Sequence, residues 1–260
     1  MDGIGLAVAD GIATITLDRA EAGNAITLPL ARSLLAAAIR CQTDDAIRCI
    51  VLTGNGRLFC AGGDVQLLAG AGDNRAQVLS ELIATFHAAV QRLARAPKPL
   101  VTLVNGPAAG AGFSLAILGD VVIGARSAHF TAAYGAIGLT PDGGLSWLLP
   151  RLVGLRRAQD IILTNRRIKA DEAEAIGLVT RIVDDEALAA EGMKVATALA
   201  NAPVAALAAS RALLADSFET GFEAQLDREL RSMAIAGSGR ESEEGLSALI
   251  ARRPANFRGA

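Results

Sequence analysis

The 260-residue chain is poor in histidine, aromatic residues and cysteine. It has two histidines, His87 and His129, and only 3% of its residues are Phe, Trp or Tyr. Metal catalysis therefore has little to build on, because zinc and related ions rely on histidine and cysteine ligands. The three cysteines, Cys41, Cys49 and Cys60, are odd in number and lack CxxC spacing. We expect reduced thiols in a cytoplasmic protein, with neither a disulfide framework nor a metal site.

The chain also lacks clusters of positive charge and long apolar runs. Its formal net charge is −2, and no run of Lys and Arg is present, which argues against a nucleic-acid surface. Gly, Asp or Arg interrupts each apolar stretch before the roughly 18 residues that a transmembrane helix needs. No basic segment followed by an apolar run opens the chain, as a secretory signal would. We expect a cytoplasmic protein without nucleic-acid or membrane partners.

Common nucleotide and hydrolase motifs are missing as well. The glycines at 106, 110 and 112 do not have GxGxxG spacing, and the chain contains no GxxxxGK[ST]. The segment GFSLA at 112–116 is a near miss to the GxSxG nucleophile elbow, with alanine in the last position. A serine hydrolase also needs a histidine base. We interpret His87, in an amphipathic stretch, and His129, beside a strand-like stretch, as packed or surface residues.

Apolar residues are abundant, at 52% of the chain, and their patterning predicts an α/β core. Residues 4–8 and 12–17 alternate about Asp10-Gly11 and predict a β-hairpin. Thr27 is suited to cap a helix that reaches about residue 40, with Pro29 in its first turn. The remaining pattern predicts parallel strands at 47–53, 100–104 and 121–124, alternating with helices at 74–95 and 109–118.

Strand signals stop near residue 186, and four helices are predicted at 186–200, 204–215, 221–236 and 241–252. We therefore predict a core domain over 1–200 that carries the ligand site, and a helical region over 201–260. A region of about 60 residues is small for a core of its own. We expect it to pack on the core or on a neighbouring subunit.

Two glycine-rich segments, FCAGGD at 59–64 and VNGPAAGAG at 104–112, each follow an apolar run and open a predicted helix. Such turns present free backbone N–H groups and let a ligand approach the backbone closely. Two N–H donors that converge on one oxygen form an oxyanion hole, which suits a thioester becoming an enolate. Taken singly, each turn is better explained as a plain strand-to-helix connection.

Asp142 lies in the third informative segment, IGLTPDGG at 137–144, just ahead of an apolar run. It is suited to cap the following helix. It is also suited to act as a base at a loop tip, because burial in an apolar pocket would raise the pKa of its carboxyl group. Local sequence leaves both interpretations open.

Taken together and in order, these segments resemble the enoyl-CoA hydratase/isomerase (crotonase) superfamily over nearly the whole chain. The matching pieces are LDR at 17–19 with Asn24-Ala25, VLTG at 51–54 leading into 59–64, Lys98-Pro99, 105–112, 138–144, 173–177 with Leu178-Val179, and the tail at 244–257. The resemblance implies a spiral core of ββα units and a helical C-terminal region that forms trimers or dimers of trimers. It also implies an acyl-CoA thioester substrate, with no cofactor beyond the CoA of the substrate itself.

The resemblance also assigns candidate site residues. The oxyanion donors of the family fall on the backbone N–H groups of Gly63 and Ala111, although the family usually has glycine at the second position. Phe257 and Arg258 in the tail match a CoA contact, which a neighbouring subunit can receive. The expected substrate-binding residues are Ala61, Gly62, Asp64, Gly110, Ser114 and Tyr134.

The acidic residues depart from the hydratase pattern. Family hydratases use two glutamates, and Ser114 and Tyr134 stand at those positions here. Asp142 matches the catalytic aspartate of the dienoyl-CoA isomerases and of the ring-modified phenylacetyl-CoA isomerases. The segment through 147–151 looks especially like the latter group. We therefore predict an enzyme that shifts a C=C double bond through a thioester enolate, with Asp142 as proton shuttle.

Several alternatives remain open. One is an enoyl-CoA hydratase that uses Asp142 with Tyr134. Another is an aspartate nucleophile, as in the dehalogenases of the family. That reaction would need an aromatic-lined pocket, and the chain has only one Trp, one Tyr and seven Phe to build it. A third is a non-catalytic acyl-CoA binder. A nucleic-acid-binding homologue would need a basic patch, which the sequence does not show.

Overall fold

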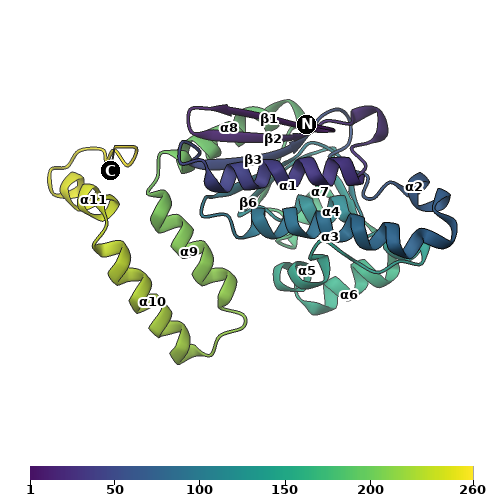
Figure 1. The fold of residues 1–260 in the computed structure, drawn as a ribbon. Helices are drawn as coiled ribbons and strands as arrows, with labels where there is room; N and C mark the ends of the chain where they lie inside the picture. Colours follow the sequence, from purple (N-terminus) through teal and green to yellow (C-terminus); the bar gives the residue numbers. More distant parts are fainter. Residues whose placement is uncertain (260) are drawn as a thin grey trace.

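A six-stranded sheet forms the centre of the computed structural model, which describes residues 1–259 (Figure 1). The two N-terminal strands form the predicted antiparallel hairpin, and the remaining neighbours pair in parallel. This confirms the α/β core expected from the alternation of strands and helices. In spatial order the strands are β1 (Ile4–Ala9), β2 (Ile12–Leu17), β3 (Cys49–Gly54), β4 (Leu100–Val104), β6 (Val121–Ala125) and β9 (Arg181–Val183).

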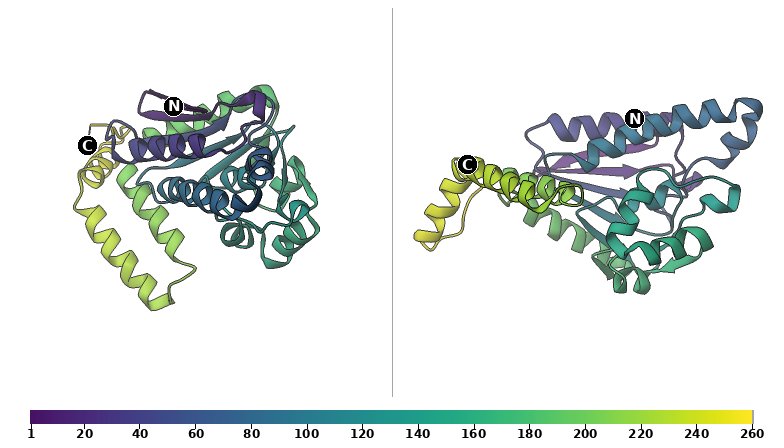
Figure 2. Two further views of the ribbon diagram at one scale, coloured as in Figure 1. Left: turned by 45° about the vertical axis from the view of Figure 1, so that its right-hand side comes forward. Right: turned by 90° about the horizontal axis from the view of Figure 1, so that it is seen from below.

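Helices cover both faces of this sheet. On one face α1 (Leu28–Thr43), α3 (Arg75–Ala94) and α4 (Ala111–Ala116) enclose the larger core, and α1 and α3 lie side by side (Figures 1 and 2). On the other face α8 (Leu188–Ala200) packs against strand residues such as Val51 and Leu103. Strands that are buried on both faces read as continuous apolar runs, which is why β3 and β4 could be found from the sequence.

A second, smaller sheet sits beside the first and shapes the candidate site. It consists of β5 (Ala108–Ala109), β7 (His129–Thr131) and β8 (Arg167–Lys169). The short helices α2 (Val65–Gly70), α5 (Leu145–Val153), α6 (Leu155–Thr164) and α7 (Ala170–Ala175) complete the core region. The two-residue strand β5 follows directly on β4, so the chain passes from the large sheet into the small one before α4 begins.

Most predicted elements are confirmed, and one helix starts later than expected. Thr27 caps α1, its hydroxyl accepting a hydrogen bond from Leu30 N–H at 3.4 Å. The predicted helix at 109–118 is only Ala111–Ala116. Ala109 pairs with Thr131 in the small sheet, and Gly110 has φ +53, so neither continues a right-handed helix.

The last three helices form an arm that extends away from the core (Figures 1 and 2). They are α9 (Val204–Asp216), α10 (Phe222–Gly237) and α11 (Arg240–Ile250). Polar contacts tie α9 to the core, among them Arg211 Nε to Asp120 Oδ1 at 2.7 Å. The arm buries few of its apolar side chains within this chain. The division into domains at residue 200 stays a prediction.

The helices of residues 1–259 are short or polar by the standard of a membrane span. No single helix in that range is long and apolar enough to span a bilayer. One pair of helices, over Asp185–Ala200 and Val204–Asp216, meets the length and composition requirement together, but the two are bent by 103° at the break between them.

Candidate active site

The two glycine turns predicted from the sequence lie against each other. Cys60 pairs with Ala108 in an isolated parallel bridge, and Ala109 N–H donates to Cys60 O at 2.9 Å. Gly62 has φ +98, and a Cβ there would lie 2.8 Å from Ala109 O. No other residue type fits this close approach without displacing backbone. The turns therefore form one rigid unit built from segments about fifty residues apart.

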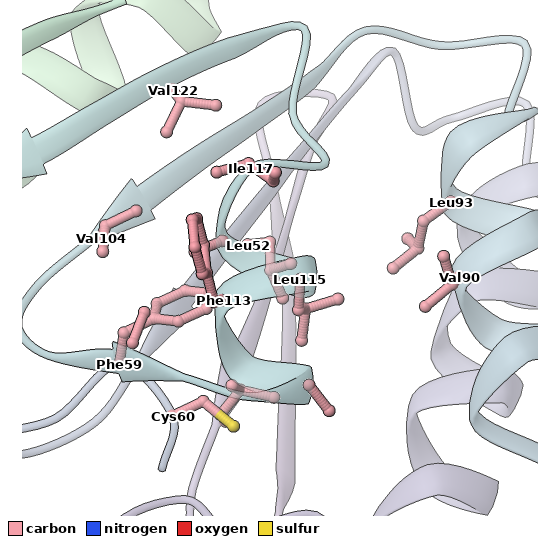
Figure 3. Packing of buried hydrophobic residues seen from close by; sticks show 14 of the residues in the cluster. Leu52, Phe59, Cys60, Val90, Leu93, Val104, Phe113, Leu115, Ile117 and Val122 are labelled. Atoms are coloured by element: carbon pink, nitrogen blue, oxygen red, sulfur yellow. The ribbon is translucent and has the colours of Figure 1, made fainter. Parts of the chain in front are cut away.

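Buried aromatic side chains anchor this unit from beneath. Phe59 and Cys60 of the first turn and Phe113 of α4 point into the same buried cluster (Figure 3). The ring of Phe113 also packs on Phe130 of β7, with 5.4 Å between ring centroids. Because both turns are attached to fully buried side chains, their backbone positions are set before any ligand binds.

Asn24 holds the first turn in place. Its side chain is fully buried, and its Nδ2 donates to Asn55 O and Leu58 O at 2.9 Å and to Phe59 O at 3.1 Å. Its Oδ1 accepts from Arg19 N–H at 2.8 Å. Asn24 also has φ +56, a left-handed conformation that asparagine tolerates better than most residues. The Asn24-Ala25 motif is thus a structural support for the turn.

Gly63 and Ala111, whose backbone N–H groups are the expected oxyanion donors, both line a cavity of about 250 Å³. Within residues 1–259 neither N–H donates a hydrogen bond to protein. Ala111 is the first residue of α4, where the chain has no intrahelical partner for the N–H and where alanine is unstrained. The cavity is predominantly apolar, and its remaining lining residues are Ile26, Ala61, Gly62, Val65, Leu68, Leu79, Leu82, Ile83, Phe86, Gly110, Ala133, Tyr134, Ile137, Leu139, Thr140 and Asp142.

Asp142 enters this cavity as its one carboxylate among the described residues. Tyr134, the first residue of the short 3₁₀ helix Tyr134–Ile137, donates its hydroxyl to Asp142 Oδ1 at 2.6 Å. The capping interpretation of Asp142 is not seen, because Gly144 occupies the N-cap position of α5 and no side chain caps that helix. The carboxylate is therefore available for contact with a ligand.

The surroundings of Asp142 change its acidity. Burial raises the pKa of the Asp142 carboxyl above its ordinary value, while the hydrogen bond from Tyr134 opposes the rise. Burial, with the neighbouring negative charge of Asp142, raises the pKa of the Tyr134 phenol. Tyr134 accordingly stays protonated and donates a hydrogen bond. The raised pKa of the Asp142 carboxyl makes this group better able to take up and release a proton.

Ser114 and His87 support the Asp142 loop from outside the cavity wall. Ser114 is fully buried, and its hydroxyl donates to Asp142 O at 2.8 Å and lies 3.2 Å from Tyr134 OH. His87 Nε2 accepts a hydrogen bond from Gly143 N–H at 2.9 Å. The interpretation of His87 as a packed or surface residue missed this contact. His87 lies four residues after the lining residue Ile83, so the two share one face of α3, and this spacing was the available signal. Nothing in the local sequence indicated which loop packs against that face.

Neither Asp64 nor the chain terminus is among the residues that line this cavity. Asp64 caps α2, its Oδ1 accepting from Leu67 N–H at 3.2 Å, and it lies 4.0 Å from Arg19 beside a second cavity of about 700 Å³. Arg258 bonds Asn201 Oδ1 and Asp10 O on the far side of the molecule. A CoA contact by Arg258 on a neighbouring subunit stays a prediction.

The remaining reactive groups do not converge on a further site. Cys41, Cys49 and Cys60 are free and buried, and burial raises the pKa of the Cys60 thiol to about 12. Such thiols are poor nucleophiles. In the part of the chain that the structure describes, no group of three or more His, Cys, Asp or Glu side chains is arranged to hold a metal ion.

Comparison with known proteins identifies the family. The sequence profile of the enoyl-CoA hydratase/isomerase family matches residues 7–260. The chain belongs to the enoyl-CoA hydratase/isomerase family. It is 38% identical over 253 residues to the 1,2-epoxyphenylacetyl-CoA isomerase of Escherichia coli K12, covering 97% of each chain. It is 39% identical over 252 residues to a protein of Rhodobacter capsulatus described as a probable enoyl-CoA hydratase, covering 97% of this chain and 96% of the relative.

Solved structures of enoyl-CoA hydratases share the fold of this chain. The enoyl-CoA hydratase of Bacillus anthracis superposes with a TM-score of 0.94 at 27% identity, with full coverage of both chains. The crotonase-like fold expected from the sequence is confirmed, and the family acts on acyl-CoA thioesters. Because the relatives include both isomerases and hydratases, family membership alone does not choose between the two reactions.

Proposed function

We propose that this protein is an enoyl-CoA isomerase in which Asp142 carries a proton between two carbons of the acyl chain. The observation that supports this most directly is the composition of the cavity. One half-buried carboxylate, with a raised pKa, shares a predominantly apolar space with two free backbone N–H groups, those of Gly63 and Ala111. This set is sufficient for enolate chemistry on a thioester.

The proposed reaction begins with a 3-enoyl-CoA whose thioester oxygen accepts hydrogen bonds from the N–H groups of Gly63 and Ala111. Asp142 removes a proton from C2, and the electron pair of that C–H bond is delocalised into the thioester as an enolate. The two N–H donors stabilise the charge on oxygen. Asp142 then returns the proton to C4, which leaves the double bond between C2 and C3 and regenerates the carboxylate. No cofactor is needed beyond the CoA of the substrate.

Hydration is the second candidate, and the side chains beside Asp142 argue against it. Water addition needs a base to activate water and an acid to protonate carbon. Ser114 uses its hydroxyl hydrogen on Asp142 O, and the high pKa of Tyr134 makes it a poor acid or base. The specific observation in favour of hydration is the 2.6 Å Tyr134–Asp142 contact, which could support a two-residue relay.

The experiment that distinguishes these candidates measures two reactions of the purified protein side by side. We expect conversion of 3-enoyl-CoA to 2-enoyl-CoA, with 2-enoyl-CoA hydration at least ~10²-fold slower, because only one carboxylate is present. Hydration without isomerisation would favour the Asp142–Tyr134 relay. Binding of acyl-CoA with neither reaction would favour the non-catalytic binder.

Tyr134→Phe tests the hydrogen bond to the proposed shuttle. The phenol donates to the ionised carboxylate and so lowers the pKa of Asp142, and its removal must raise that pKa. Because the ionised form is the base, we expect the acidic limb of the kcat/KM profile to move to higher pH. Activity well above that limb should fall less than ~10-fold. A profile that stays in place would show that Tyr134 does not tune Asp142.

We also propose that the chain assembles as a trimer, or a dimer of trimers, through the arm of α9–α11. Only Val204 and Ala248 of these three helices are buried in the single chain. Large apolar residues on the arm, including Met233, Ile235 and Leu249, are more than 70% exposed and line a groove of about 1090 Å³. Monomers rarely leave such a surface uncovered. Sedimentation equilibrium should give the mass of three or six chains, and a monomer would refute the assembly.

A further inference from the structure

The peptide group between Asp142 and Gly143 is held at both of its polar atoms. Its carbonyl oxygen accepts the Ser114 hydroxyl hydrogen at 2.8 Å, and its N–H donates to His87 Nε2 at 2.9 Å. The two partners come from different helices, Ser114 from α4 and His87 from α3. Neither side chain is among those that line the cavity, so both contact the Asp142–Gly143 peptide from outside the cavity lining.

The position after Asp142 accepts glycine and leaves no room for a side chain. Gly143 is buried with φ +59, and a Cβ there would lie 2.8 Å from Ser114 Cβ and 2.9 Å from Phe86 Cε1. A buried N–H that loses its partner costs about as much as a lost hydrogen bond, so the Gly143 N–H depends on His87. Rotation of the peptide would also turn the bond from Cα to Cβ of Asp142 and so move the carboxylate.

From these contacts we infer that His87 and Ser114 are positioning residues that clamp the Asp142–Gly143 peptide and thereby aim the carboxylate at the substrate carbons. The inference rests on the proposed function, because it assigns the clamp to the proton shuttle. His87 acts as an acceptor in this arrangement, so its Nε2 carries no hydrogen and the imidazole is neutral. Misplacement of a catalytic group by about 1 Å costs roughly 10²-fold in rate, which sets the size of the expected effect.

His87→Gln and His87→Leu form the matched pair that tests the clamp. The Gln side-chain oxygen can accept from Gly143 N–H, whereas Leu fills similar space without an acceptor. We expect His87→Leu to lower kcat by about 10- to 100-fold with KM changed less than about 3-fold. For His87→Gln we expect kcat and KM to stay within about 3-fold of the parent values. Equal kcat for His87→Leu and the parent would overturn the inference, as would a His87→Gln variant as slow as His87→Leu.

Amide hydrogen exchange at Gly143 gives a readout that does not depend on turnover. We expect this amide to be protected in the parent and in His87→Gln and to exchange faster in His87→Leu, whose melting temperature should be lower by several degrees because the buried N–H has lost its acceptor. A Gly143 amide that remains protected in His87→Leu would overturn the clamp. Since exchange is measured without substrate, it separates a wrong clamp from a wrong assignment of the reaction, which the isomerase assay of the parent tests.

Ser114→Ala completes the experiment. If Ser114 and His87 hold the same peptide group, the double variant Ser114→Ala with His87→Leu should lose less activity than the product of the two single losses. Strictly multiplicative losses would show that the two side chains act on different groups, and they would overturn the shared clamp.

Discussion

Asp142→Asn is expected to lower kcat for isomerisation by about 10²- to 10⁴-fold, the usual contribution of a general acid–base group. The amide keeps the size of the carboxyl group and can still accept from the Tyr134 hydroxyl, so the cavity should keep its shape. What it loses is the ability to take up a proton from carbon and release it again. The measurement is steady-state turnover of 3-enoyl-CoA, accompanied by the Kd of a saturated acyl-CoA.

Asp171→Asn is the matched control for this result, because Asp171 is a highly exposed aspartate that pairs with Arg126 at the surface. It should leave kcat and Kd unchanged. If Asp142→Asn retained more than a tenth of the parent rate with its binding intact, another group would have to move the proton. The assignment of Asp142 as shuttle would then be wrong.

The hairpin, the buried strands and the long helices could be predicted because each depends on a local pattern. The alternation about Asp10-Gly11 and the continuous apolar run of β4 are properties of neighbouring residues. The start of α4 was misplaced for the opposite reason. Ala108–Ala109 pairs with β7 some twenty residues later, and two alanines carry no local strand signal.

The same distinction separates the predicted parts of the site from the missed ones. The glycine turns were recognisable from their composition, Asp142 was singled out by the resemblance to the family, and the structure brings them to one cavity. The contacts of Ser114 and His87 with the Asp142–Gly143 peptide were not recognisable, because each spans 28 residues or more. A serine that donates to a backbone oxygen and a histidine that accepts from a backbone nitrogen leave no motif, since their partner is a peptide group.

Ala111→Pro should remove one donor of the proposed oxyanion hole without disturbing the fold. Ala111 is the first residue of α4, where proline is well tolerated because the N–H has no intrahelical partner. The preceding residue, Gly110, has φ +53 and ψ −128, outside the α region that a following proline disfavours. We therefore expect the melting temperature to stay within a few degrees while kcat falls about 10²- to 10³-fold, as for loss of one such donor elsewhere.

Two controls separate the lost donor from other consequences of proline. Ala111→Ser keeps the backbone N–H and should keep kcat within a few-fold. The proline ring also projects toward the cavity, so the Kd of a saturated acyl-CoA reports whether substrate still enters. An oxyanion hole acts on charge that develops during the reaction, so its loss should lower kcat far more than binding. A variant that binds more weakly but turns over at the parent rate when saturated would show that Ala111 N–H does not stabilise the enolate.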